Sequence, residues 1–216
     1  MELTLIIGNK NYSSWSLRPW IFLKYFNLDF KETNVSLFTE TSDKELAPYF
    51  SNFKVPVLKD GDQLIWDSLS ILEYLSENFC AGSGWPEDKN ARAFSRSMSA
   101  EMHSSFTALR NELPMNCRKS FSSIRLSSDA TEDVKRIITL WNTAHEKYGS
   151  GEEWLMGKFS IADAMYIPVV LRFHGYGIET QGYANDYIQT VLNNRHIKEW
   201  IDAGTLETEI IEEDEI

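Results

Sequence analysis

The sequence predicts a two-part fold, an α/β domain followed by an all-helical domain. Residues 1–80 alternate between short apolar runs typical of strands and longer helical patterns. Residues 81–90 (AGSGWPEDKN) collect Gly, Ser, Pro and charged residues, the composition of a linker. From residue 91 apolar residues recur at spacings of three and four, as on one face of a helix. We therefore expect an α/β domain over 1–80, a linker over 81–90, a helical domain over 91–205 and an acidic tail over 206–216.

The first 80 residues follow the order of a small α/β domain. Gly8 ends the first apolar run, and an Asp60-Gly61 turn between two short apolar runs is typical of a hairpin. The expected elements are a strand over 3–7, a helix over 17–26, a strand over 30–37, a hairpin of 55–58 with 64–66, and a helix from Ser68.

The helical part begins with a long apolar stripe from Ala91 to Leu113, which predicts one helix that ends near Pro114. Asp129 and Glu132 are spaced as a capping box before a second helix. Ser160 and Asp163 form a fuller capping box before residues that are almost wholly apolar through 171. We expect the helix after Ser160 to be the core helix, kinked at Pro168.

The net charge of −11 comes from 21 Lys and Arg against 32 Asp and Glu, and six of these acids lie in residues 207–216. An acidic chain argues against nucleic acid or an anionic membrane as a partner, because both attract Lys and Arg. The tail is expected to be solvated. We find no signal-peptide pattern at the N-terminus and no apolar run near the ~18 residues of a membrane span. With Cys80 and Cys117 isolated in the sequence, a cytoplasmic location is expected.

Serines precede the first predicted helix in the segment YSSWSLRPW, residues 12–20. If Ser16 is the N-cap, Pro19 stands at the third helical position, the last one that tolerates proline well. Ser13 and Ser14 then lie at the positive end of the helix dipole, where a hydroxyl can donate to an anion. Capping alone is the competing explanation for these serines.

Two further signals occur in the same domain. Val55-Pro56 opens a short strand, where proline is either an edge device or a cis peptide. Asp67-Ser68 precedes an apolar helix, where one residue should be the N-cap. A helix N-terminus can also hold a carboxylate through its free N–H groups, while Asp67 faces an ammonium group.

Serine before the first helix, Val-Pro at the third strand and an acid-Ser pair at the next helix together resemble the cytosolic glutathione transferase family. The resemblance covers residues 1 to about 205 and includes Ser160-Ile161-Ala162-Asp163 in the core helix. It is strongest to the serine-type branch, particularly the zeta class of maleylacetoacetate isomerases, although Trp15 stands where that class usually has Cys. It implies a thioredoxin-like N-terminal domain, glutathione as co-substrate, a small electrophile as second substrate, a role in detoxification and a homodimer.

The resemblance also implies roles for individual residues. Ser13 or Ser14 would donate a hydrogen bond to the glutathione sulfur, and the spacing to Arg18 fits one class from Ser13 and another from Ser14. The implied glutathione contacts are Trp15, Lys54, Val55 with a cis-Pro56, Asp67 and Ser68. Tyr12, His103 and Arg110 would line the electrophile pocket, a satisfied polar core edge being the alternative for the last two.

The chemistry of a thiol sets what such a site must supply. At pH 7 a free thiol is only about 3% thiolate, and lowering its pKa by two units requires about 2.7 kcal/mol. A serine hydrogen bond of about 1.5–3 kcal/mol and a helix end of about 0.3–1 kcal/mol suffice together. The histidines fit no ligand spacing, so no metal is expected. The alternatives are a zeta-like isomerase, a glutathione peroxidase and a non-catalytic binding module. Serine in place of cysteine disfavours a thiol-disulfide oxidoreductase.

Overall fold

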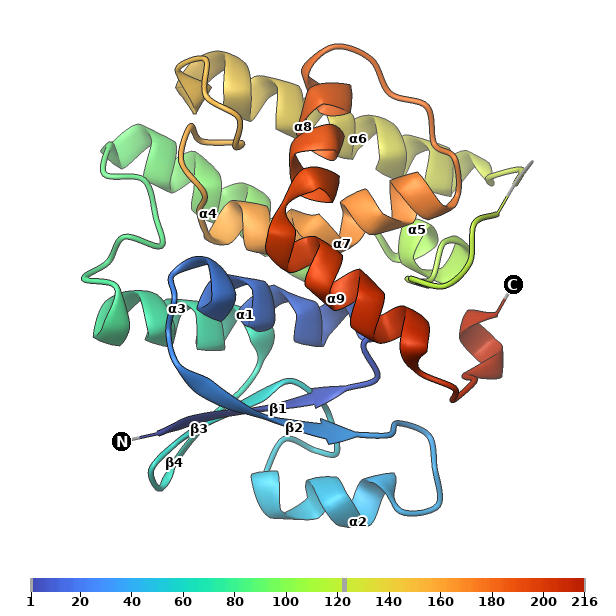
Figure 1. Cartoon of the computed structure of the whole chain (residues 1–216). Helices are drawn as coiled ribbons and strands as arrows, with labels where there is room; N and C mark the ends of the chain where they lie inside the picture. Colours follow the sequence, from blue (N-terminus) through green and yellow to red (C-terminus); the bar gives the residue numbers. More distant parts are fainter. Residues whose placement is uncertain (1, 122–123, 216) are drawn as a thin grey trace.

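The computed structural model describes residues 2–121 and 124–215, so Met1 of the predicted first domain and Ile216 of the predicted tail lie outside the described residues. A four-stranded mixed sheet in the order β2-β1-β3-β4 lies in the lower half of the view in Figure 1. Its strands are β1 (Leu3–Gly8), β2 (Phe30–Val35), β3 (Val57–Asp60) and β4 (Gln63–Ile65). β1 runs parallel to β2 and antiparallel to β3. β3 and β4 form the predicted hairpin about Asp60-Gly61, with Asp60 opposite Gln63.

Helices cover both faces of this sheet (Figure 1). α1 (Ser14–Tyr25) and α3 (Ser68–Phe79) lie between the sheet and the helical part, whereas α2 (Ser42–Leu46) and the single 3₁₀ turn η1 (Ala47–Tyr49) lie on the opposite face. β1 alternates little in burial, because its Leu5, Ile6 and Ile7 are all fully buried between these layers.

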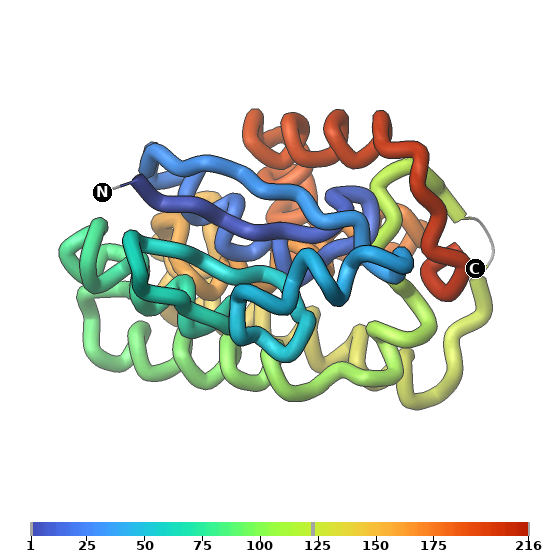
Figure 2. The backbone as a smooth tube through the Cα atoms, turned by 90° about the horizontal axis from the view of Figure 1, so that it is seen from below, coloured from blue at the N-terminus to red at the C-terminus, as the bar shows by residue number. Residues whose placement is uncertain are grey.

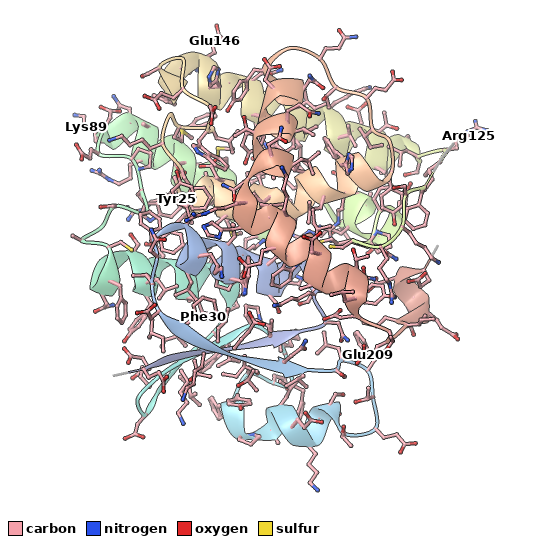
Figure 3. The ribbon with its side chains drawn as sticks, in the orientation of Figure 1. Tyr25, Phe30, Lys89, Arg125, Glu146 and Glu209 are labelled. Atoms are coloured by element: carbon pink, nitrogen blue, oxygen red, sulfur yellow. The ribbon has the colours of Figure 1, made fainter. Side chains whose placement is uncertain are left out.

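The rest of the chain is helical and packs on α1. Its elements are α4 (Lys89–Ser104), α5 (Thr107–Glu112), α6 (Ser128–Ala144), the π-helical turn η2 (His145–Gly149), α7 (Ile161–Gly175), α8 (Tyr183–Asn193), α9 (Arg195–Leu206) and η3 (Glu212–Asp214). α7 packs against both α1 and α4. At the far end of α1, Tyr25 (labelled in Figure 3) stacks on Phe159 with ring centroids 3.9 Å apart. The predicted fold class, an α/β part followed by an all-helical part, is confirmed.

α7 is the core helix that the sequence predicts. The capping box at its start is formed, since Asp163 accepts hydrogen bonds from Ser160 N at 2.8 Å and Ser160 Oγ at 2.9 Å. Asp163 also accepts from Leu155 N at 3.1 Å, which joins the preceding loop to the helix. Across the residues that the structure describes, we find no helix long and apolar enough to cross a membrane.

Two expectations for the helical part are wrong. The long helix over 91–113 is broken, because Phe106 takes a left-handed conformation (φ 61°) between α4 and α5. The free groups at this break have partners: Asp133 of α6 accepts from Leu109 N at 3.0 Å, and Arg110 donates to the carbonyl oxygen of Met102.

The second error concerns the start of α6. Its N-cap is Ser127, whose Oγ accepts from Ala130 N at 3.1 Å, and Asp129 lies inside the first turn. The predicted capping box of Asp129 with Glu132 is therefore not the start of this helix. A serine hydroxyl two residues earlier caps it instead.

The acidic tail is not a solvated extension. Glu207 accepts hydrogen bonds from the backbone N–H groups of Lys10 at 2.7 Å and Asn11 at 2.9 Å. Glu209, labelled in Figure 3, accepts from Ser36 Oγ at 3.2 Å, and Ile211 is only 5% exposed. Figure 2 shows the tail, in red, leaving α9 and passing beside the chain that follows α5. Glu207 thus accepts from the loop between β1 and α1, and Glu209 from the residue after β2, which holds the tail against the body of the protein.

Candidate active site

All eleven predicted site residues line one cavity of about 1010 Å³. They come from the loop before α1, the segment before β3, the start of α3, and α4 and α5. The cavity is also lined by the exposed aromatic side chains of Phe38, Phe53 and Trp66, and by Ile211 and Asp214 of the tail. The predicted residues that it collects are Tyr12, Ser13, Ser14, Trp15, Lys54, Val55, Pro56, Asp67, Ser68, His103 and Arg110.

The loop before α1 gives its serines different surroundings. Ser13 is the N-cap of α1, with its Oγ accepting from Ser16 N at 3.4 Å and donating to Ser16 Oγ at 2.7 Å. Ser16 Oγ in turn accepts from Gly8 N at 3.1 Å. The expectation that Ser16 caps the helix is wrong. α1 begins at Ser14, so Pro19 lies within the helix rather than at its third position.

Ser14 is the first residue of α1 and does not cap the helix. Its Oγ accepts a hydrogen bond from Nη2 of Arg172 at 3.2 Å, and the side chain is 7% exposed, at the cavity wall. A serine that accepts from a guanidinium still has its own O–H to donate. Arg172 comes from α7, 158 residues further along the chain, and also donates to the carbonyl oxygens of Leu113 at 2.8 Å and Pro168 at 3.2 Å.

Sequence reasoning missed Arg172, although a signal was present. The residue directly follows the apolar run of the core helix, and a charged side chain at such a position is almost never fully buried unless it has partners. Arg172 is 7% exposed. An arginine within the most apolar helix of the chain was therefore the observation that could have indicated a second functional element.

The start of α3 combines an N-cap with one buried hydroxyl that has no partner among the described residues. Asp67 is the N-cap, accepting from Leu69 N at 3.1 Å, and its other oxygen lies 3.1 Å from Nε2 of His103. Ser68 Oγ is buried and has no hydrogen-bond partner among the described residues. A buried hydroxyl without a partner is costly, so a ligand that bonds to it here is favoured.

The Val55–Pro56 peptide bond is cis, as the resemblance implies, and the Trp66–Asp67 bond is cis as well. A hydrogen bond fixes the backbone before the Val55–Pro56 bond, since Ser51 Oγ donates to the carbonyl oxygen of Lys54 at 2.6 Å. One part of the cavity wall is formed by Lys54, Val55 and Pro56, as the sequence predicts for this segment.

Three arginines surround the start of α1. The guanidinium carbons of Arg18 and Arg110 lie 4.2 Å and 4.6 Å from the ring centroid of Trp15, and Arg172 holds Ser14 beside it. Burial, reinforced by the charge of Arg110, lowers the pKa of Arg172 to about 10. Burial and then both neighbouring guanidinium groups lower the pKa of Arg18 well below its ordinary value. Of the three arginines, Arg110 and Arg172 line the cavity, whereas Arg18 lies buried behind its wall.

Candidate metal ligands do not gather in this part of the protein. Over residues 2–121 and 124–215, no group of three or more His, Cys, Asp or Glu side chains is placed to hold a metal ion. The two cysteines are free, and burial raises the pKa of Cys117 to about 12.

The chain is similar in sequence to several curated proteins. Residues 12–78 match the family described as glutathione S-transferase, N-terminal domain. Protein IN2-1 homolog B of rice (Oryza sativa subsp. indica) is 25% identical over 74% of this chain and 61% of its own length, so the chain spans less than two thirds of that relative. Glutathione S-transferase 1 of Dianthus caryophyllus is 28% identical over 77% of this chain and 75% of its own length. A probable maleylacetoacetate isomerase of Caenorhabditis elegans is 27% identical over 71% and 72%.

Solved structures share the fold over nearly the whole chain. A diazinon-metabolizing glutathione S-transferase of the silkworm Bombyx mori has a TM-score of 0.74 at 17% identity, covering 95% of this chain and 98% of its own. A glutathione transferase homolog from Burkholderia, solved with bound glutathione, has a TM-score of 0.70 at 19% identity, covering 94% and 98%. Residues 12–78 are thus similar to the N-terminal domain of glutathione S-transferases, and the whole chain shares the two-part fold of these solved structures.

Proposed function

We propose that this chain is a glutathione transferase in which Ser14 donates a hydrogen bond to the glutathione sulfur. The observation that carries the proposal is that the two serine hydroxyls have different hydrogen-bond partners. Ser13 spends its hydroxyl hydrogen on Ser16, whereas Ser14 accepts from Arg172 and keeps its hydrogen for a ligand in the cavity. The choice between Ser13 and Ser14, which the sequence leaves open, thus falls on Ser14.

The local electrostatics favour a thiolate at this position. A hydrogen bond to a charged partner contributes about 1.5–3 kcal/mol, and the N-terminus of α1 adds about 0.3–1 kcal/mol. Because Arg172 polarises the Ser14 hydroxyl through its oxygen, the serine becomes a stronger donor. The activated sulfur then attacks a small electrophile: a carbon–sulfur bond forms, the leaving group departs with its electron pair, and the thiol proton passes to solvent.

The remaining cavity residues supply the groups that glutathione requires. Ser68 Oγ, buried and without a partner, and the N-terminal amides of α3 suit the γ-glutamyl carboxylate. Asp67, held by His103, suits the ammonium group. The backbone of Val55, ahead of Pro56, suits the cysteinyl unit, and Lys54 suits the glycyl carboxylate.

Replacing each serine by alanine tests the assignment. With chlorodinitrobenzene as acceptor, Ser14→Ala is expected to lower kcat/KM by about 10- to 100-fold at slightly acidic pH, the loss of one charged hydrogen bond. Ser13→Ala is the matched control: it removes the α1 cap, costs about 1 kcal/mol of stability and leaves a measurable thiolate signal for bound glutathione. Equal rates for the wild type and Ser14→Ala would refute the role of Ser14.

A zeta-like isomerase is the second candidate. It is favoured by relatives named probable maleylacetoacetate isomerase and glutathione S-transferase zeta class, the latter from Euphorbia esula and 29% identical over 72% of this chain. In that reaction the thiolate adds reversibly and leaves again, so glutathione is not consumed. Turnover of maleylacetone with catalytic glutathione would assign the isomerase, whereas no turnover with either substrate would leave a non-catalytic binding module.

Homodimer formation and a cytoplasmic location are part of the same proposal. Phe50 is 79% exposed beside Trp66, with ring centroids 5.5 Å apart, and such an apolar pair on a surface favours a protein contact. Light scattering of the purified chain and of Phe50→Ser tests the dimer.

A further inference from the structure

The residues from 9 to 14, called the serine loop below, are held by segments that are far away in the chain. The side chain of Asn11 in this loop is fully buried. Its Oδ1 accepts hydrogen bonds from the backbone N–H groups of Cys117 and Arg118, both at 2.9 Å. The segment that follows α5 is therefore bound directly to the serine loop.

Arg118 extends this contact with its side chain. Its guanidinium donates to the hydroxyl oxygen of Tyr12, on the serine loop, at 2.6 Å. It also donates to two carbonyl oxygens of the tail, those of Glu207 at 2.5 Å and Glu209 at 2.9 Å. A planar guanidinium has enough N–H donors in fixed directions for these three acceptors, whereas a lysine ammonium is a compact charge. One side chain thus joins the serine loop to the first part of the tail.

The hydroxyl of Tyr12 joins the serine loop to the last part of the tail. It donates its hydrogen to a carboxylate oxygen of Glu215 and accepts a hydrogen bond from Arg118. Glu215 is fixed in turn, since it accepts from Asn116 Nδ2 at 3.0 Å and pairs with Lys119. Although Tyr12 lines the cavity, its hydroxyl has no hydrogen left to donate to a ligand there.

The link between Tyr12 and Ser14 is short and closely bonded. Ser13 N donates to the carbonyl oxygen of Asn9, and Ser14 N to that of Tyr12, both at 2.8 Å. Such a turn leaves little freedom between the two residues, so a displacement of Tyr12 also displaces Ser14. The Ser14 hydroxyl has to keep its bond to Arg172 and to reach a ligand, and hydrogen bonds weaken steeply when their geometry is poor. The place of the serine loop therefore decides what Ser14 can do.

We propose that Arg118 is a positioning residue for Ser14. By joining Tyr12 to the tail, it keeps the serine loop where the Ser14 hydroxyl reaches the glutathione sulfur. The inference rests on the proposed function, because it concerns the same serine and the same thiol. Arg118 does not line the cavity, so it acts on the thiol from outside the site.

Two measurements on the wild type and on Arg118→Met test this role. Ultraviolet absorbance gives the pKa of the bound glutathione thiol, and calorimetry with S-methylglutathione, which has no free thiol, gives the affinity of the peptide contacts alone. In Arg118→Met the pKa of the bound thiol should rise by about 0.5 to 1, because part of one charged hydrogen bond is lost. The value of kcat/KM with chlorodinitrobenzene should then fall about three- to tenfold at acidic pH and approach the wild type at alkaline pH. The affinity for S-methylglutathione should stay close to that of the wild type.

A residue with a merely structural role would give another pattern. Binding of S-methylglutathione would weaken, or the rate would fall equally at every pH. A folded Arg118→Met protein with an unshifted thiol pKa would overturn the proposal. The matched control is Arg125→Met, because Arg125, labelled in Figure 3, is exposed and lies outside the cavity. An equal rise of the thiol pKa in this control would also overturn the proposal, since the cause would then be the net charge.

Two further variants follow the link through Tyr12. Arg118→Lys keeps the charge without the planar set of donors, so its thiol pKa should lie between those of the wild type and Arg118→Met; a wild-type value would mean that charge alone is responsible and would refute positioning. Tyr12→Phe removes only the hydroxyl and should raise the thiol pKa in the same direction. Combined with Arg118→Met it should add nothing, whereas additive shifts would refute the link. If Arg118→Met does not fold, Tyr12→Phe decides the question, and an unshifted pKa in it refutes the proposal.

Ser14→Ala separates this inference from the proposed function. If Ser14→Ala raises the thiol pKa and Arg118→Met does not, the proposed function stands and the role of Arg118 is refuted. If Ser14→Ala leaves the thiol pKa unchanged, the proposed function fails and the inference fails with it. In a Ser14→Ala background, Arg118→Met is expected to have no further effect on the pKa. A further rise there would show that Arg118 acts by another route and would overturn the inference.

Discussion

Replacing Arg172 tests whether the two halves of the protein act together on the thiol. Arg172 touches no part of the proposed sulfur position itself and acts through the Ser14 hydroxyl, 3.2 Å away, so it is a positioning residue. Removing the guanidinium leaves Ser14 a neutral, less polarised donor. We take about 1.5 kcal/mol, the lower end for a charge-assisted hydrogen bond, as the loss passed on to the sulfur.

That magnitude converts into a shift of the pH profile. A loss of 1.5 kcal/mol raises the pKa of the bound thiol by about one unit, so the thiolate fraction well below that pKa falls about tenfold. In Arg172→Met, kcat/KM for chlorodinitrobenzene should therefore drop about tenfold at acidic pH and approach the wild type at alkaline pH. The ultraviolet absorbance of the thiolate, titrated in the complex with glutathione, gives the same pKa independently.

Arg172→Met is also expected to destabilise the fold, and this effect must be distinguished from the shift of the thiol pKa. The carbonyl oxygens of Leu113 and Pro168 lose their donor, which costs on the order of 2–4 kcal/mol in a buried site. Arg172→Lys retains a positive charge, so the pKa of the bound thiol in this variant is expected to lie between those of the wild type and Arg172→Met. A merely structural residue would lower the rate equally at every pH. A folded Arg172→Met protein with an unshifted thiol pKa would refute the coupling.

The remaining predictions concern stability. Asp163→Ala leaves buried donors at Ser160 and Leu155 without an acceptor and should lower the free energy of unfolding by about 3–6 kcal/mol in urea titrations. Burial raises the pKa of Asp163 from 3.8 to about 6, so the folded chain binds this proton more tightly than the unfolded chain. The difference in unfolding free energy between the wild type and Asp163→Ala should therefore widen as the pH falls from 7 to 5. A difference that narrows over this range would contradict a raised pKa in the folded state. Ser127→Ala removes the α6 cap and should cost about 1 kcal/mol in the same titration. Glu207→Ala frees two loop amides, whose hydrogen exchange should accelerate relative to the sheet; unchanged exchange would mean that the tail does not hold the loop.

The parts of the fold that sequence predicted are those in which one local pattern decides the structure. Ser160 and Asp163 cap α7 as their spacing predicts, because both partners of the capping box lie within one turn. The Asp60-Gly61 hairpin is likewise local. The candidate site residues line one cavity, and they were chosen together because of the resemblance, since no single motif required them to be neighbours.

The features that the sequence could not predict depend on contacts between segments that are far apart in the chain. The apolar spacing of α4 continues into α5, since Met102, Phe106 and Leu109 are all buried on either side of the break, so periodicity cannot show where the helix ends. The break is held by Asp133 of another helix. The hydrogen bond that distinguishes Ser14 from Ser13 likewise comes from Arg172, which no local pattern links to either serine.

The bond between Ser14 and Arg172 limits how such a protein can be recombined. Ser14 belongs to the sheet-bearing half and Arg172 to the core helix of the other half. A chimaera that joins this N-terminal half to the helical half of a relative would keep the residues proposed to contact glutathione and lose the guanidinium that donates to Ser14. A helical half that carries an arginine at the matching turn of its core helix would keep this hydrogen bond, whereas one without it is expected to behave like Arg172→Met, with a rate about tenfold lower at acidic pH. Under the proposed function, the activity of such a chimaera at acidic pH would depend on one residue of the core helix, which lies outside the half that carries Ser14.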